Sequence, residues 1–386
     1  MMSQFSKREL LATLRPRYLS SSKTEKQRIL DELVATLGYH RKHAIRLLRR
    51  KAPRRPKVKR VRPRKYTIDV VLALEKVWRL ANCIATKRLV PSLKEFVEAL
   101  ERHGEMSLEP KTRELLLSIS AASADRLLTR ARQADLRYRG KTTTKPGTLL
   151  KQSIPIRTFA DWDDAKPGFV EVDLVAHCGE STHGEYLHSL NTIDVATRWT
   201  EPVGIVNRSQ AKVSEAVVVV RGRLPFPLLG IDSDNGGEFI NANLKRYCEQ
   251  NGITFTRSRP YKKNDQAYVE QKNWTAVRQF VGYSRYEGQA ACDLLNQLYE
   301  PLRAYINYFQ PVMVLIEKER NGAKVKKKYD EAKTPYQRAL ESSDVSEEVK
   351  ARLRETYLTL NPAALLREIN TRQRALWRLA KEGITE

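Results

Sequence analysis

Three acidic residues stand in sequence contexts that suit metal binding. Asp173 lies within the apolar strand pattern 169–175, where an ionised carboxylate is costly to bury unless a positive charge neutralises it. Asp234 follows the apolar run 226–231 at an acidic turn, and Glu270 lies in a helical pattern, with 35 residues between the two. Asp-Asn-Gly is also an ordinary turn, so Asp234 alone says little. Together the three carboxylates predict a metal site at the edge of a sheet.

The segments around these acids carry further information. They are Glu171–Val175, Ser233–Phe239 and Asn264–Glu270. These segments resemble the catalytic core of the retroviral-integrase superfamily, and specifically the DDE transposases of bacterial insertion sequences, whose Asp-to-Glu gap of 35 residues they share. Asn191–Arg198 is similar to the family's second strand and its turn. The resemblance is strongest over residues 169–283, and it implies a ribonuclease-H-like α/β core in which helices flank a mixed sheet.

The resemblance also implies a reaction. Water or a 3′-hydroxyl would attack a phosphodiester in line, and negative charge would build on the entering and leaving oxygens. Two Mg²⁺ ions, for which Mn²⁺ can substitute, stabilise both oxygens when they lie roughly 3.5–4 Å apart. By resemblance, Asp173 bridges the two ions, Asp234 holds one and Glu270 the other. These three residues are therefore the expected catalytic and metal-binding residues, and no protein nucleophile is implied.

Other residues compete for these roles. Asp232 lies two positions before Asp234, so on a strand it shares the same face and is the alternative ligand. Asp194 and Asp265 are further acids near the ends of predicted elements. A metal site from the neighbouring residues His177, Cys178, His183 and His188 is disfavoured, because strand alternation scatters them over two faces. In related integrases, lysines one and two turns after the Glu meet the DNA end; here Trp274 breaks that match.

Basic residues are concentrated in the first part of the chain. Residues 1–150 contain 36 Lys and Arg against 14 Asp and Glu, whereas the remaining residues contain 34 against 31. The net charge of +25 therefore belongs mainly to residues 1–150. Such segregation indicates a polyanionic partner. Nucleic acid is favoured over an anionic membrane, because no lipidation motif accompanies the charge.

The chain, at 386 residues, suggests two to four domains. Residues 1–50 are predicted to form a helix-turn-helix DNA-binding domain, with a first helix that begins after Thr24 and ends at Gly38. A basic recognition helix, His40–Arg50, follows. An ordinary helical hairpin is the alternative. Residues 51–65 form a basic linker with nine Lys or Arg and three Pro, which favours an extended arm along phosphates.

The rest of the chain divides into four segments. Residues 66–135 are predicted to form a second helical, helix-turn-helix-like domain, and residues 136–167 an extended linker. Residues 168–309 are the integrase-type core, and residues 310–386 a C-terminal region with a β-hairpin and helices.

The core is predicted to contain both strands and helices. Its predicted strands are Phe169–Ala176, Glu185–Asp194, Arg198–Ile205, Leu228–Asp232 and Ile253–Arg257. Its predicted helices are Gln210–Arg221, Phe239–Gln250 and a long helical region, Asp265–Tyr308. In the C-terminal region, Asn321-Gly322 predicts the hairpin turn, and Asn361-Pro362 predicts the start of a helix whose apolar stripe packs on its own domain or on a second protomer.

Candidate DNA-binding residues share a positive charge and a predicted exposed position. They lie on the recognition helix, in the basic linker, on the last helix before residue 135, and in the loop before Glu270. They are Arg41, Lys42, Arg46, Arg49, Arg50, Arg54, Arg55, Lys57, Lys59, Arg60, Arg62, Arg126, Arg130, Lys262 and Lys263.

These features favour a transposase. It would bind terminal inverted repeats, cut at 3′ ends and join them to target double-stranded DNA, as at least a dimer on DNA because two ends must be held together. A ribonuclease-H-like nuclease without strand transfer and a DNA-binding repressor are the alternatives.

The chain has no apolar stretch long enough for a membrane helix and no apolar signal region, so we expect a cytoplasmic, nucleoid-associated protein. Its four cysteines form no Cys-x-x-Cys pair, which disfavours disulfides and zinc ribbons.

Overall fold

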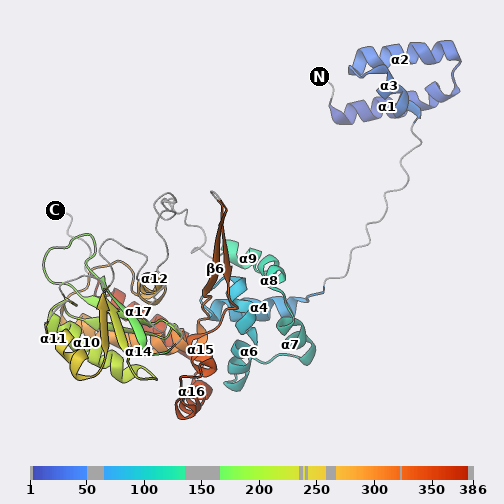
Figure 1. Cartoon of the computed structure of the whole chain (residues 1–386). Helices are drawn as coiled ribbons and strands as arrows, with labels where there is room; N and C mark the ends of the chain where they lie inside the picture. The colour runs from blue at the N-terminus through green and yellow to red at the C-terminus, as the bar shows by residue number, and fades with distance from the viewer. Residues whose placement is uncertain are drawn as a thin grey trace. The chain divides into compact units, whose positions relative to one another are not determined.

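The computed structural model describes most of the chain in two compact units, Met1–Lys65 and Tyr66–Glu386 (Figure 1). The described residues are 3–49, 65–134, 166–233, 238–239, 242–257, 267–321 and 324–380. Side chains are not described for Ala242, Arg257, Ala267, Glu270, Lys318, Arg320, Asn321 and Lys324. Within these ranges no helix is long and apolar enough to cross a membrane. All four cysteines are free thiols, as expected from their spacing.

The first unit is a bundle of three helices, α1 (Gln4–Ser20), α2 (Lys23–Leu37) and α3 (Arg41–Arg49). Its core includes Tyr18, Leu33 and Leu48. The sequence predicted only α2 and α3, because the apolar residues of α1 form no clear stripe and Pro16, which lies inside the helix, argues against one. The predicted cap at Thr24 is wrong: the Ser22 side chain accepts from the Glu25 N–H. Gly38 ends α2 as predicted, with φ +68, a conformation that favours glycine.

The second unit begins with a group of short helices around Trp78, which is fully buried. The helix predicted over residues 123–132 is two helices that break at Leu128, which is itself buried in the core of the unit. The elements are α4 (Ile68–Leu80), α5 (Thr86–Leu89), η1 (Val90–Ser92), α6 (Leu93–Arg102), α7 (Pro110–Leu117), α8 (Ala121–Leu127) and α9 (Thr129–Ala134).

A five-stranded mixed sheet forms the centre of the second unit, with strand order β3-β2-β1-β4-β5. β1 and β2, and β2 and β3, pair antiparallel, whereas β4 pairs parallel with both β1 and β5. The strands are β1 (Phe169–Ala176), β2 (His188–Asp194), β3 (Thr200–Ile205), β4 (Gly230–Ser233) and β5 (Thr254–Arg257). β1 therefore has the predicted bounds, and the predicted mixed sheet is confirmed.

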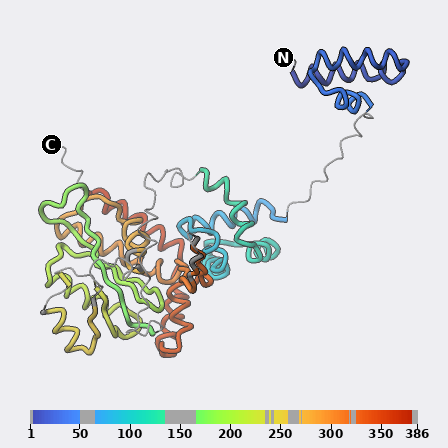
Figure 2. The backbone as a smooth tube through the Cα atoms, turned by 45° about the horizontal axis from the view of Figure 1, so that its top comes forward, coloured from blue at the N-terminus to red at the C-terminus, as the bar shows by residue number. Residues whose placement is uncertain are grey.

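Helices flank this sheet on both sides. In Figures 1 and 2, α10 (Gln210–Arg223) and α11 (Ala242–Gln250) lie on the opposite side of the sheet from α14 (Gly288–Phe309). The prediction that α11 begins at Phe239 is wrong, because Phe239 is buried in the preceding turn. The predicted long helical region before Tyr308 is also interrupted. It consists of α12 (Ala267–Lys272), a π-helical segment η3 (Asn273–Arg278), α13 (Gln279–Val281) and, after a break, α14.

The C-terminal region packs onto the same unit. It contains the predicted hairpin, β6 (Leu315–Asn321) and β7 (Lys324–Tyr329), then α15 (Pro335–Glu341), α16 (Glu347–Thr359) and α17 (Pro362–Trp377). Asn361 caps α17 as predicted, since its side chain accepts from the N–H groups of Ala363 and Ala364. Ile369 and Leu376 are buried, and α17 packs against α14. The apolar stripe of α17 therefore packs within its own unit.

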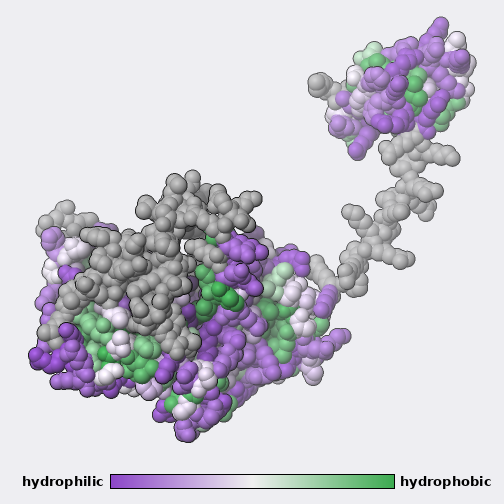
Figure 3. Space-filling view, in the orientation of Figure 1, coloured by the Kyte–Doolittle hydropathy of each residue, from purple (hydrophilic) through white to green (hydrophobic). Residues whose placement is uncertain are grey.

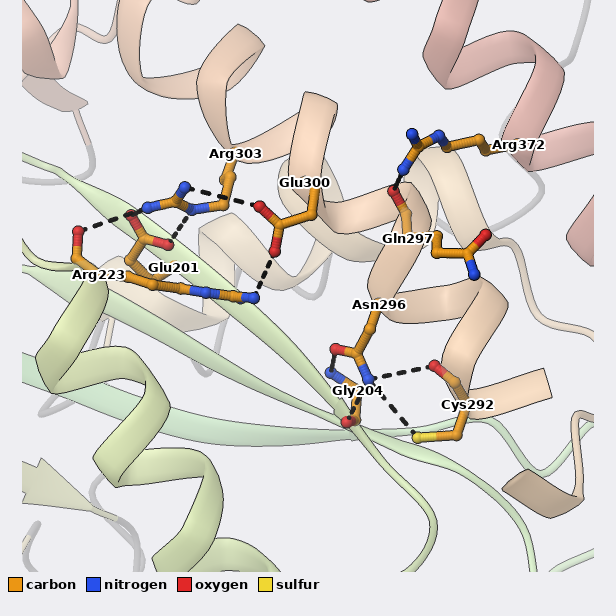
Figure 4. Close-up of polar contacts among 9 residues, drawn as sticks. All are labelled: Glu201, Gly204, Arg223, Cys292, Asn296, Gln297, Glu300, Arg303 and Arg372. Atoms are coloured by element: carbon orange, nitrogen blue, oxygen red, sulfur yellow. Dashed lines mark hydrogen bonds and ion pairs between the residues drawn. The ribbon is translucent and has the colours of Figure 1, made fainter. Parts of the chain in front are cut away.

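A polar network fastens α14 to β3 (Figure 4). Glu201 of β3 is fully buried and accepts from Arg303 of α14, with 2.5 Å between Oε2 and Nε and 3.0 Å between Oε1 and Nη2. Two turns earlier, the Asn296 side chain pairs with both the N–H and the C=O of Gly204 at 2.9 Å. A Cβ at Gly204 would lie 2.9 Å from a Leu295 methyl carbon, so the close approach of α14 requires glycine here. These contacts hold the sheet rigid on the side that carries the candidate site.

One buried histidine gives the second unit a pH-dependent stability. His177 is fully buried, with its Nε2 atom 2.7 Å from Ser189 Oγ. Burial lowers the pKa of His177 from 6.5 to about 3, and the nearby charges of Arg278 and His188 act in the same direction. Between these values the unfolded chain binds a proton that the folded protein does not. The contribution of His177 to the free energy of unfolding therefore falls as the pH is lowered from about 6.5 towards 3.

We expect His177→Gln, which cannot titrate, to be less sensitive to acid than the wild type. The difference in Tm between variant and wild type should move in the variant's favour as the pH falls from about 7 to about 5. Thermal unfolding followed by circular dichroism at several pH values measures this. A difference that stays constant over this range would contradict the assignment.

Candidate active site

The central strand β1 presents two acids on one face of the sheet. Glu171 and Asp173 are two residues apart and therefore point to the same side. Glu171 lies beside Asp232 in the parallel register of β1 and β4. Asp173 lies opposite Asn191 of β2. The site is thus built on the middle of the sheet, where the strands are held on both edges.

Asp173 is half-buried, and its carboxylate is held by hydrogen bonds. Its Oδ1 atom accepts from the N–H of Leu174 at 2.8 Å. Its Oδ2 atom accepts from Asn273 Nδ2 at 2.5 Å. Asn273 in turn accepts from the side chain of Asn191 at 2.8 Å. Two asparagines from distant segments therefore fix the orientation of the predicted catalytic carboxylate.

Glu171 holds the start of the helix that carries Glu270. Its Oε2 atom accepts from the backbone N–H groups of Tyr268 at 3.2 Å and Val269 at 2.9 Å. These N–H groups belong to the first turn of α12, and N–H groups in the first turn of a helix have no acceptor within the helix. Burial raises the pKa of Glu171 to about 8, although the Val269 N–H and Arg198 favour the charged form. Glu171 therefore ties β1 to α12 across 97 positions of sequence.

The sequence interpretation assigned Glu171 no role. A signal for it was present in the Glu-x-Asp alternation of β1, which places Glu171 on the same face as Asp173. Nothing in the sequence, however, showed that a helix N-terminus would lie above it.

Two basic residues lie in this part of the unit, and the charge of one of them, Arg198, acts on Glu171. The Arg198 guanidinium lies 3.6 Å from the centre of the Tyr268 ring. Lys272, two residues after Glu270, is also buried. Burial lowers the pKa of Lys272 to about 7, and the charges of Arg88 and Arg198 act in the same direction. The side of this helix that carries Lys272 therefore packs into the protein.

The structure places the three predicted ligands to different degrees. Asp173 is described fully, and the backbone of Glu270 lies in α12, whose next segment contacts Asp173. The Glu270 side chain and Asp234 lie outside the described residues. β4 is described to Ser233, which lies beside Val172 in the register with β1. The register between the two strands is described as far as this pair.

The competing residues have other contacts. Asp194, buried at the end of β2, accepts from the N–H of Gly168 at 2.7 Å and from the N–H and hydroxyl of Thr197 at 2.7 and 2.6 Å, so it stabilises a turn. Asp232 accepts from the Thr256 hydroxyl at 2.7 Å. Asp265 lies outside the described residues. Over the described part of the chain, no group of three or more His, Cys, Asp or Glu side chains is placed to hold a metal ion, and this includes His177 and its neighbours.

The candidate DNA-binding residues are exposed wherever they are described. Arg41, Lys42, Arg46 and Arg49 lie on α3, where Arg41 pairs with Asp31. The exposed residues Arg126 and Arg130 lie on α8 and α9. The others fall outside the described residues: Arg50, Arg54, Arg55, Lys57, Lys59, Arg60, Arg62, Lys262 and Lys263. Their contact with DNA stays a prediction.

Comparison with known proteins identifies the core. A family model described as the integrase core domain matches residues 163–263. The uncharacterized protein y4rM of Sinorhizobium fredii is 43% identical over 339 residues, which is 87% of this chain and 96% of that protein. The predicted resemblance to an integrase-type core is thus confirmed.

Two solved structures show a more distant likeness. The catalytic core domain of BIV integrase aligns with a TM-score of 0.30 and 17% identity, over 49% of this chain and 97% of that chain. The catalytic core domain of HTLV-2 integrase in complex with magnesium gives a TM-score of 0.30 and 14% identity, over 38% and 91%. At these scores the likeness adds nothing to the family match. The chain carries an integrase core domain and belongs to one family with y4rM of Sinorhizobium fredii.

Proposed function

We propose that this protein is the DNA transposase of an insertion sequence. It binds the terminal inverted repeats of its element, cleaves DNA at the 3′ ends and joins those ends to target DNA in Mg²⁺-dependent reactions. The observation that supports this most is the hydrogen bond between Asp173 and Asn273, because it joins the central strand of an integrase-type core to the segment directly after the Glu270 helix.

The donor set on this face suits a hard divalent cation. Asp173 offers a half-buried carboxylate at the middle of the sheet. Glu171 and Asp232, on the same face, are buried and accept hydrogen bonds from the Val269 N–H and the Thr256 hydroxyl. Oxygen ligands of this kind fit Mg²⁺, or Mn²⁺ in its place. In the proposal, Asp173, Asp234 and Glu270 hold two ions, which when bound stabilise charge on the entering and leaving oxygens of the phosphodiester.

The chain's own residues orient this site. Asn273 and the Leu174 N–H donate to the two oxygens of Asp173 and so fix its rotamer. Glu171 fixes the first turn of α12, and with it the position of Glu270 along the sheet. The attacking group is water or a 3′-hydroxyl, so no side chain forms a covalent intermediate.

DNA binding is assigned to the N-terminal part of the chain. The exposed basic residues of α3 would lie against the DNA of the terminal repeat, and the helical region α4–α9 would act as a second reading module. Transposition holds two ends at once, so we propose at least a dimer on DNA.

A gel assay tests the proposal. Labelled duplexes that carry the ends of the encoding element are incubated with the protein in Mg²⁺ or EDTA, alongside Glu270→Gln. The matched control is Glu215→Gln, which changes an exposed Glu of α10 that pairs with Lys212. We expect nicked and joined products in Mg²⁺ with wild type and control, and none with Glu270→Gln. Nicking without joining would support a nuclease, and salt-sensitive binding without cleavage would support a repressor.

A further inference from the structure

Two large aromatic side chains lie exposed next to the candidate active site. Trp274, in η3, is 55% exposed, and Tyr283 is 64% exposed. Their ring centres are 6.4 Å apart, with 39° between the ring planes. Phe280 and Tyr286, in the same part of the chain, are buried. Figure 3 shows a largely hydrophilic face that also has several apolar areas, so exposure alone does not distinguish the two rings. Their pairing beside the candidate active site does.

The pair is held in place from below. The Arg278 guanidinium lies 4.7 Å from the centre of the Tyr283 ring. It also donates to the carbonyl of Ala176 at 2.8 Å and to that of Gly282 at 3.3 Å. Gly282 has φ +84, a conformation that other residues rarely adopt, and it turns the chain between Val281 and Tyr283. Tyr283 is therefore held by Arg278 before any ligand arrives, and this lowers the entropy that its side chain loses on binding.

The pair also lies close to the predicted catalytic carboxylate. Trp274 directly follows Asn273, whose side chain donates to Asp173 Oδ2 at 2.5 Å. Ala176, which anchors Arg278, is the last residue of β1, three positions after Asp173. The backbone segments that carry the two rings are thus joined, through Asn273 and Arg278, to the strand that carries Asp173.

We propose that Trp274 and Tyr283 form a stacking site for an unpaired DNA base next to the phosphate that is cut. This rests on the proposed function. Aromatic side chains stack on the faces of unpaired bases, and each stacked base typically tightens binding about 5- to 150-fold. In the duplex those faces are covered by neighbouring bases, so the site selects a base that has left the stack.

The size of the pair argues against a protein partner. A stable protein interface buries roughly 1,200–2,000 Å² in total. Two aromatic side chains supply about 150–250 Å² each when fully buried, and these two are already partly covered. The positive Arg278 beside Tyr283 also suits a polyanion.

The test is a binding measurement in which no cleavage takes place. Each of the last nucleotides of the element's end is replaced in turn by the fluorescent base 2-aminopurine, and the full chain is added with Ca²⁺ in place of Mg²⁺. The variants are Trp274→Ala, Tyr283→Ala and the conservative Trp274→Phe. Leu358→Ala, which removes a large side chain that is 54% exposed on α16, is the control.

We expect one nucleotide position to change its fluorescence on binding, and this change to be lost in both alanine variants. Trp274→Phe and the control should retain it. An abasic nucleotide at that position should weaken binding to the wild type about 5- to 150-fold and have no further effect on Trp274→Ala. Equal responses in wild type and Trp274→Ala at every position would overturn the proposal, even if the protein cleaves DNA. A stacking response without any cleavage in Mg²⁺ would instead leave the stacking site in place and contradict the transposase.

Discussion

Asp173→Asn is expected to slow both 3′-end cleavage and joining by at least about a thousandfold while DNA binding stays unchanged. A metal ion contributes several kcal/mol to the stabilisation of a phosphoryl-transfer transition state, and each 1.36 kcal/mol is a factor of ten in rate. The substitution removes the negative charge but keeps the size of the side chain. Its carboxamide oxygen still accepts one of the hydrogen bonds that reach Asp173 from Leu174 and Asn273. The strand should therefore fold as in the wild type.

A second substitution at the same position separates a metal ligand from a structural residue. Asp173→Cys places a thiolate where the carboxylate stands. Mg²⁺ prefers hard oxygen ligands, whereas Mn²⁺ accepts softer ones more readily. We expect this variant to be inactive in Mg²⁺ and partly active in Mn²⁺. Asp344→Asn, at an exposed aspartate in the turn before α16, is the control and should match the wild type in both metals. Full activity of Asp173→Asn would show that another acid holds the ions.

The sheet was the most predictable part of the fold. β1 has the bounds that its alternation of apolar and acidic residues indicates, because Val170 and Val172 are buried on the face opposite Glu171 and Asp173. The helix of Glu270 was less predictable. Its apolar spacing suggested one continuous helix, but residues 273–278 are π-helical. In this segment Asn273 contacts Asp173 across 100 positions of sequence and also contacts Asn191. Local sequence patterns do not predict contacts between such distant residues.

The candidate site likewise has a part that could be predicted from the sequence and a part that could not. The residue types and spacing of the acids were enough to indicate the integrase-type core, which the family match confirms. The residues that orient the acids were not recognised, because Glu171 and Asn273 act through contacts with segments far away in the sequence. α1 was missed for a different reason: its helical face is only weakly apolar, and the helix is stabilised by packing against α2 and α3.

Glu171→Leu is expected to lower the cleavage rate about a hundredfold without weakening DNA binding. Leucine has no oxygen to accept from the N–H groups of Tyr268 and Val269, and each buried donor left without an acceptor costs about 1–3 kcal/mol. The first turn of α12 should relax by shifting, and Glu270 shifts with it. A displacement of about 1 Å in a catalytic group can cost a factor of about 100 in rate. Single-turnover cleavage and calorimetric binding of Mn²⁺ measure the two consequences, and both should weaken together.

Glu171→Gln tests whether Glu171 supports cleavage by positioning α12 or through its negative charge. Its carboxamide oxygen can accept from the same two N–H groups, so the helix should stay in place and cleavage should remain within a few-fold of the wild type. Loss of activity in both variants would instead mean that the negative charge itself contributes to metal binding, and Glu171 would then be a further ligand. Loss of activity in neither would show that α12 is positioned by its other contacts, with the bond from Asn273 to Asp173 as the main one. The two N–H groups that Glu171 accepts favour geometry, because an uncharged carboxamide oxygen can accept from both of them.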